Sequence, residues 1–136
     1  MEVEIFHGTD YKNAVDIKNE GFIYKPNDEH WLGNGVYFYQ DYSLAKWWTQ
    51  NPTSKFGTKV ENPAILCCKI EVDDNKVLNL LKLEDYKFFL STFEDEFFPK
   101  YRQKYPSEAT FWKKIRCAYG DYLKKEFEMD MIVGNF

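Results

Sequence analysis

A short strand followed at once by a capped helix is the feature of this sequence that most restricts its fold. Residues 3–7 alternate apolar and polar side chains before Gly8, which predicts a strand that ends at a turn. Asp10 is a typical helix-capping residue and Gly21 a typical stop, so a helix is expected over Tyr11–Glu20. Because strand and helix are mixed along the chain, an α+β fold is expected.

The remaining elements are expected in the same mixed order. The length of 136 residues suits a single domain over residues 1–136, since no repeat or change of composition marks a boundary. Strands are expected at residues 36–39, 64–72 and 129–136, with a short strand or turn within 77–83, and the strand at 64–72 should be buried. Helices are expected at 43–50, 83–98 and 110–125, with loops at 23–30, 51–63 and around Pro106.

Charge and cysteine content argue against several classes of protein. A net charge of -4 disfavours general binding to nucleic acid, although a local basic cleft stays open. No run approaches the ~20 apolar residues of a membrane helix, and the acidic N-terminus is unlike a signal peptide, so a cytoplasmic protein without membrane contact is expected. Cys67 and Cys68 are adjacent and Cys117 stands alone, a spacing that predicts neither a disulfide framework nor a metal site.

The sequence is rich in aromatic side chains and carries a group of basic residues near its C-terminal end. Aromatic residues make up 19% of the chain, so rings should build the core and a binding cleft, and those between residues 86 and 98 are expected in the core. The basic residues of 113–125 are interpreted as a solvated helix face, because acidic residues interrupt them. His30 is interpreted as a solvated loop residue.

Two glycine-bearing segments are the candidates for ligand binding. His7, Gly8 and Thr9 place an imidazole at a predicted strand end, beside a glycine that lets a ligand approach the backbone. Residues 33–35 read Gly-Asn-Gly and lead into Val-Tyr-Phe-Tyr at 36–39, which again combines glycine with a strand of rings. Each segment alone is more often turn or core chemistry than a binding site.

Together, in this order and about thirty residues apart, the two segments resemble the ADP-ribosyltransferase superfamily. The match covers residues 5–48 and is closest to the diphtheria-toxin and poly(ADP-ribose) polymerase branch, which uses a His-Tyr-Glu set. That resemblance implies an ADP-ribosyltransferase-like core, a split mixed and antiparallel sheet flanked by helices. It also implies NAD as the substrate and no metal.

The resemblance implies a role for each matching residue. His7 would hydrogen-bond the adenosine-side ribose, the Gly8 backbone would hold the nicotinamide carboxamide, and Thr9 would support the turn. Gly35 would permit close approach of NAD to the backbone. Tyr37 would pack along the nicotinamide and serve as a catalytic-site residue.

A second ring is also implied, one turn into the following helix. Trp47 is the stacking candidate, and Trp48 is the second choice. Aromatic faces are suited to this task because they grip a flat pyridinium and attract its positive charge.

The family's catalytic glutamate has no secure match. Glu126 and Glu128 have a spacing that would place both on one face of a strand, and Asp130 follows; Glu128 is the chosen candidate. The competing interpretation is a charged helix end that leads into an edge strand. Three alternatives stay open: a C-terminally incomplete domain, a terminal acidic residue in the usual role, or NAD binding without transfer.

The expected function is mono-ADP-ribosylation of a macromolecular acceptor, protein or nucleic acid, by an enzyme of toxin or defence type. One alternative is a catalytically silent NAD-binding or interaction module of the same fold. Another is an RNA 2'-phosphotransferase, although that group relies on paired arginines and a basic surface. If strands are missing, an inhibitory partner chain or an oligomer should cover the exposed sheet edge.

Overall fold

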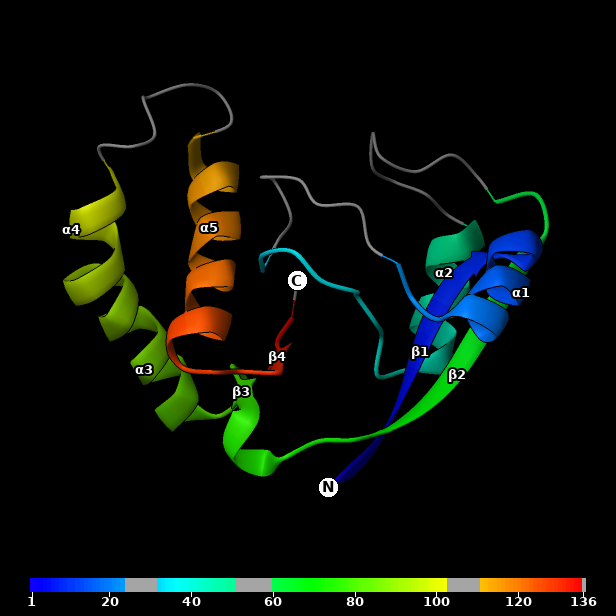
Figure 1. Ribbon diagram of the computed structural model, residues 1–136, viewed down its shortest axis with the longest axis horizontal. Helices are drawn as coiled ribbons and strands as arrows, with labels where there is room; N and C mark the ends of the chain where they lie inside the picture. Colours follow the sequence, from blue (N-terminus) through cyan, green and yellow to red (C-terminus); the bar gives the residue numbers. More distant parts are fainter. Residues whose placement is uncertain (24–31, 51–59, 103–110, 136) are drawn as a thin grey trace. The chain divides into compact units, whose positions relative to one another are not determined.

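In a computed structural model, the chain is a mixed α+β protein whose described part contains one antiparallel and one parallel pair of strands, each flanked by helices (Figure 1). The structure describes residues 1–23, 32–50, 60–102 and 111–135. These residues form two compact units, one within Met1–Tyr24 and Val36–Glu71 and the other within Lys25–Gly35 and Val72–Phe136. Most of the predicted loops at 23–30 and 51–63, together with Pro106, Thr110, Phe136 and His30, lie outside the described residues.

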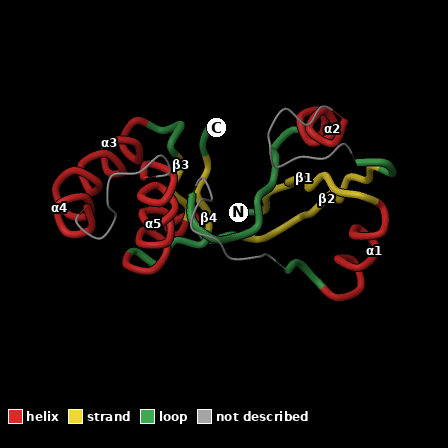
Figure 2. The backbone as a smooth tube through the Cα atoms, turned by 90° about the horizontal axis from the view of Figure 1, so that it is seen from above, coloured by secondary structure: helices red, strands yellow, loops and turns green. Residues whose placement is uncertain are grey.

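The first unit is built on a two-stranded antiparallel ribbon. Strand β1 (Glu2–Asp10) pairs with β2 (Pro63–Glu71) along its whole length, from Glu2 opposite Glu71 to Asp10 opposite Pro63. Helices α1 (Tyr11–Glu20) and α2 (Tyr42–Gln50) lie on opposite faces of this ribbon (Figure 2). The helices predicted from sequence at 11–20 and 43–50 are therefore confirmed.

Local capping explains where α1 begins and ends. The Asp10 carboxylate accepts a hydrogen bond from the Asn13 backbone N–H at 2.8 Å. Gly21 ends the helix with a φ of 87°, and its N–H donates to the Ile17 carbonyl at 2.7 Å. A positive φ of this size is accessible to glycine at little cost, which explains the residue type at this position.

Two strand predictions in this unit are wrong in detail. Strand β1 does not end at His7 but continues through Gly8 and Thr9 to Asp10, because β2 supplies ladder partners for all of these residues. The expected strand at 36–39 is reduced to an isolated bridge, in which Tyr39 exchanges backbone hydrogen bonds of 2.7 and 2.8 Å with Phe6.

The expected burial of the strand at 64–72 is also wrong. Side chains of β2 are either exposed or half-buried, and none is fully buried. Among the described residues β2 has β1 as its single strand partner, so one edge of β2 is not flanked by a strand, and its side chains are less enclosed than those of a central strand.

The second unit combines a short parallel strand pair with helices. A 3₁₀ turn (Asp74–Lys76) leads into β3 (Val77–Asn79), which pairs in parallel with β4 (Met131–Val133). The helices are α3 (Leu83–Thr92), a π-helical turn (Phe93–Phe97), α4 (Phe98–Tyr101) and α5 (Phe111–Glu126). The terminal strand is thus shorter than the predicted 129–136.

Aromatic rings form much of the core of this unit. Phe97 is fully buried and stacks on Tyr101 with ring centroids 4.5 Å apart. Tyr119 is 2% exposed, and its hydroxyl donates to the Phe89 carbonyl. Burial raises the pKa of the Tyr119 phenol, with smaller contributions from Tyr122 and other neighbours. The prediction that aromatic residues of 86–98 belong to the core is confirmed for most of them, but Tyr86 is exposed.

No helix among the described residues has the length and apolar character needed to cross a membrane.

Candidate functional site

The two segments singled out in the sequence meet in the first unit. The Nδ1 atom of His7 lies 3.0 Å from the Tyr37 backbone carbonyl oxygen. A carbonyl can only accept, so Nδ1 carries the proton in this contact. In the neutral ring, Nε2 then presents a lone pair, which can accept a hydrogen bond from a hydroxyl or amide. In a regular strand at 36–39, the Tyr37 carbonyl would accept a hydrogen bond from a neighbouring strand's backbone; here it contacts the His7 side chain.

Two phenylalanines surround the His7 ring. Phe22 and Phe38 approach it edge to face, with centroids 5.3 and 5.7 Å away, and they contact each other at 5.1 Å. Phe22 follows the helix stop directly, so the sequence places it at a defined position but carries no signal for this contact. We call His7, Phe22 and Phe38 the His7 cluster. It provides an imidazole acceptor within an apolar, aromatic setting.

Gly8 lies on the opposite face of β1 and allows close packing of α2. A Cβ atom at this position would lie 2.6 Å from Thr49 Cγ2 and 2.8 Å from the Ala45 carbonyl oxygen. Ala45 is fully buried and Thr49 is 4% exposed, as expected for the helix face that contacts the strand. The space opened by Gly8 is therefore filled by a helix. A further role of its backbone toward a ligand stays a prediction, as does the role of Thr9, which pairs with Ala64.

Residues 33–35 belong to the second unit, where they are anchored to α5. The Asn34 backbone N–H donates to Asp121 Oδ1 at 2.7 Å, and its side-chain amide donates to Oδ2 at 3.0 Å. The Lys124 ammonium donates to the Asn34 carbonyl and lies 3.6 Å from the Asp121 carboxylate. Sequence reasoning assigned Lys124 to a solvated face and missed Asp121, because these contacts join residues about ninety positions apart.

Glycines allow this segment to approach the helix. Gly33 has a φ of 88°, and a Cβ there would lie 2.5 Å from Asp121 Oδ1. A Cβ on Gly120 of α5 would lie 2.0 Å from the Leu32 carbonyl oxygen. A Cβ on Gly35 would meet only Lys124 Nζ at 3.6 Å, an ordinary contact. Packing therefore requires glycine at 33 and 120 but not at 35, whose expected role near NAD stays a prediction.

The three predicted ring residues are partly exposed in the first unit. Tyr37 is 42% exposed, Trp47 45% and Trp48 37%. The two tryptophans contact each other edge to face, with centroids 5.0 Å apart. Ala45 and Thr49 form the side of α2 that faces β1, whereas the His7 side chain points to the other face of that strand. The structure therefore does not bring Trp47 to the His7 cluster, and its stacking on nicotinamide stays a prediction.

The candidate glutamate lies in the second unit, in a different setting from the one expected. Glu126 is the last residue of α5, and Glu128 is an exposed residue of the connection to β4 with a φ of 54°. The prediction that these two share a strand face is wrong, because the helix runs through Glu126 and β4 begins only at Met131. Asp130 precedes β4, and its backbone N–H donates to the Lys76 carbonyl at 2.8 Å.

The left-handed backbone at Glu128 makes a measurable prediction. We expect Glu128→Gly to raise the free energy of unfolding by up to about 1 kcal/mol, because relief of left-handed strain outweighs the added freedom of the unfolded chain. The matched control, Glu126→Gly at the helix end, should lower it by roughly 0.5–1 kcal/mol. Urea denaturation measures both changes. A loss of stability in both variants would contradict the left-handed backbone.

The three cysteines differ in exposure and in electrostatic setting. Cys67 is exposed, whereas Cys117 is buried in α5. Burial raises the pKa of the Cys68 thiol, and the neighbouring Cys67 adds to this effect, so the reactive thiolate is disfavoured. Among the described residues, no group of three or more His, Cys, Asp or Glu side chains is placed to hold a metal ion.

Comparison with known proteins gives one distant relative. An uncharacterized protein of Methanocaldococcus jannaschii is 28% identical over 90 residues, which are 65% of this chain and 42% of the relative. The chain thus spans less than half the length of that curated relative. No family model matches the chain, and no solved structure matches it.

Proposed function

We propose that this chain is an NAD-dependent mono-ADP-ribosyltransferase, built on an ADP-ribosyltransferase-type fold and acting in the cytoplasm on a protein or nucleic acid acceptor. The contact between His7 Nδ1 and the Tyr37 carbonyl carries the proposal. It joins the two segments that resemble the family's NAD-binding motifs, although they are thirty residues apart in the chain.

The contact of His7 with the Tyr37 carbonyl supports binding of a ribose. With Nδ1–H donating to the Tyr37 carbonyl, Nε2 is an acceptor for a sugar hydroxyl. The partly exposed Tyr37 side chain supplies aromatic surface for the nicotinamide ring. A ring face is attracted to the positive charge of the pyridinium, which is present only before the glycosidic bond breaks.

The proposed reaction is a substitution at C1' of the nicotinamide ribose. The bond from C1' to the nicotinamide nitrogen breaks, and its electron pair leaves with neutral nicotinamide. A nucleophile of the acceptor forms the new bond to C1' and loses its proton. A carboxylate beside the ribose would stabilise positive charge on the sugar ring in the transition state, and Glu128 is our candidate for this role.

Substitution of His7 tests the binding half of the proposal. His7→Ala should weaken NAD binding about tenfold by calorimetry, because the sugar hydroxyl loses its acceptor. The chain's other histidine provides the matched control, and His30→Ala should bind NAD as the unsubstituted protein does. A protein that neither binds NAD nor releases nicotinamide would rule the proposal out.

The catalytic half is tested separately with Glu128→Gln. If Glu128 stabilises the transition state, nicotinamide release should fall by roughly 10²–10³-fold while NAD affinity is retained. Equal turnover in this variant would exclude Glu128 from catalysis.

A catalytically silent NAD-binding module is the second candidate. The observation in its favour is the position of Glu128, in the connection between α5 and β4 rather than on a strand. NAD binding that depends on His7, without release of nicotinamide or labelling of an acceptor, would select this alternative.

A further inference from the structure

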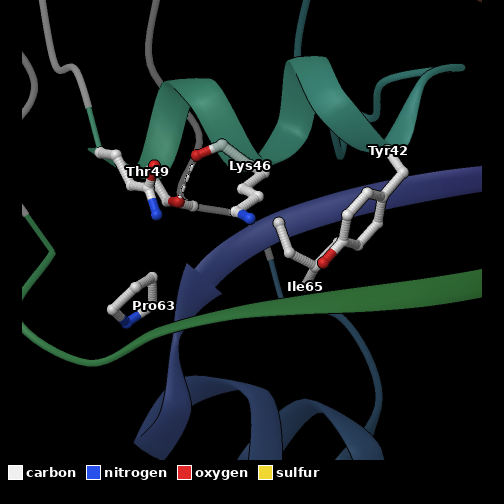
Figure 3. Close-up of a pocket in the computed structure, with 6 residues that line it drawn as sticks. Tyr42, Lys46, Thr49, Pro63 and Ile65 are labelled. Carbon is white, nitrogen blue, oxygen red and sulfur yellow. Dashed lines mark hydrogen bonds between the residues drawn. The ribbon is translucent and has the colours of Figure 1, made fainter.

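A cavity of about 210 Å³ lies between α2 and β2 in the first unit (Figure 3). It is smaller than the roughly 300–1,000 Å³ of pockets that enclose drug-sized ligands, so it suits a small group rather than a dinucleotide. Three of its polar residues come from α2 at intervals of four, and two apolar residues come from β2. The lining consists of Tyr42, Lys46, Thr49, Gln50, Pro63 and Ile65.

This cavity and the His7 cluster lie on opposite faces of the ribbon. Ile65 is the cross-strand partner of Gly8, and Gly8 faces α2. Successive residues of a strand point to opposite faces, so His7 points away from α2. The contacts of His7 with Phe22 and Phe38 agree with this placement. The cavity is therefore separate from the proposed NAD site.

Lys46 gives the cavity a positive charge. Among the described residues it is the single charged one of the lining, and none of their carboxylates forms an ion pair with it. The carboxylates of Asp10 and Asp41, which flank β1 and α2 in the sequence, instead accept hydrogen bonds from the backbone N–H groups of Asn13 and, at 2.6 Å, Ser43. The ammonium is thus left for water or a ligand.

The other groups around Lys46 are hydrogen-bonding and uncharged. Tyr42 and Gln50 stand one turn before and one turn after it, on the same face of α2. The Thr49 hydroxyl donates to the Lys46 carbonyl at 2.6 Å, which leaves its oxygen as an acceptor. The set offers an ammonium, a phenol and an amide as donors toward one small space, above an apolar floor of Pro63 and Ile65.

We propose that this cavity is a second ligand site, which binds the phosphate group of a small phosphate monoester. Three donors from successive turns of α2 match the three peripheral oxygens of a phosphate better than the two of a carboxylate. Lysine is a common phosphate ligand in proteins and binds phosphate as a point charge. The apolar floor accommodates the carbon part of the ligand.

Nuclear magnetic resonance titration of the full chain with ribose 5-phosphate tests the proposal, with inorganic phosphate and acetate as parallel probes. Both phosphates should shift the backbone signals of α2 at Tyr42, Lys46 and Gln50, and acetate should bind more weakly. Lys46→Gln should weaken ribose 5-phosphate binding at least about tenfold, because a charge-assisted hydrogen bond is lost. Tyr42→Phe keeps the ring that contacts Phe6 and should cost roughly three- to tenfold.

Lys69→Gln is the matched control, because Lys69 is an exposed lysine of β2 that does not line the cavity. It should bind ribose 5-phosphate unchanged. Equal weakening in Lys46→Gln and Lys69→Gln, or no shift of the α2 signals by either phosphate, would overturn the proposal. His7→Ala should leave phosphate binding intact, so this site can stand if the proposed NAD site fails. Competition between NAD and ribose 5-phosphate would overturn the separation of the two sites.

Discussion

Replacing Gly120 with alanine should lower the free energy of unfolding by about 3 kcal/mol, near the upper end of the usual cost of overpacking. The added Cβ would lie 2.0 Å from the Leu32 carbonyl oxygen, 2.1 Å from the Leu32 carbonyl carbon and 2.5 Å from the Gly33 nitrogen. All three are backbone atoms, so no side-chain rotation can relieve the clash. Either α5 or the segment at 32–35 must move.

The expected loss of stability is opposite in sign to the usual effect of Gly→Ala in a helix, so the sign of the change alone tests the clash. In a helix interior, Gly→Ala ordinarily raises stability by roughly 0.5–1 kcal/mol, because alanine loses less backbone entropy. At Gly120 the steric clash should outweigh this gain, and the free energy of unfolding should fall. Urea or thermal denaturation followed by circular dichroism measures the change, and a stabilised variant would show that residues 32–33 do not pack on α5.

Gly35→Ala is the matched control for Gly120→Ala. Its Cβ would meet only the flexible end of Lys124, at 3.6 Å. The free energy of unfolding should therefore change by less than about 0.5 kcal/mol. A large loss in this variant as well would assign the effect to the glycine-rich segment in general and not to the contact with α5.

Gly8→Ala should lower the free energy of unfolding by about 2 kcal/mol, through a clash in the other unit. The new Cβ would lie 2.6 Å from the Thr49 methyl and 2.8 Å from the Ala45 carbonyl oxygen, so α2 must shift away from β1. Without the clash, the substitution would favour the strand, since glycine weakens strand interiors.

A double-mutant cycle separates packing from ligand binding at this position. Thr49→Ala removes the methyl that the new Cβ meets first, so Gly8→Ala should cost less in that background. Part of the cost should remain, because the Ala45 carbonyl is backbone. Additive losses would contradict the contact with Thr49. If instead stability is unchanged and NAD binding is lost, Gly8 serves the ligand and not the helix.

Helix α1 and its caps could be predicted in full from sequence. The Asp10 carboxylate bonds the Asn13 N–H and the Gly21 N–H bonds the Ile17 carbonyl, contacts that span three and four residues. Such short-range signals are readable because both partners lie within one turn of the chain. The same reason explains why α2 and α5 were located to within one residue.

The candidate site was predictable only in outline. The sequence predicts that His7 and Tyr37 belong to one binding site, and in the structure a hydrogen bond joins these two residues. The sequence could not reveal that Phe22 lines the His7 ring, that α2 fills the space beside Gly8, or that Glu128 has a left-handed backbone. Each of these depends on which elements pack together, and no local pattern encodes that choice.

By itself, therefore, the sequence determined the α+β class, the bounds of most helices and the two segments worth testing for NAD. The tertiary structure decided how those segments are held: the strand at 36–39 shrank to one bridge at Tyr39, and Asn34 bound Asp121 on α5. The physical reason is the distance along the chain between the residues that interact. Caps and alternation act between neighbours, whereas the hydrogen bonds of Asn34 join residues 87 positions apart and form only after the chain has packed.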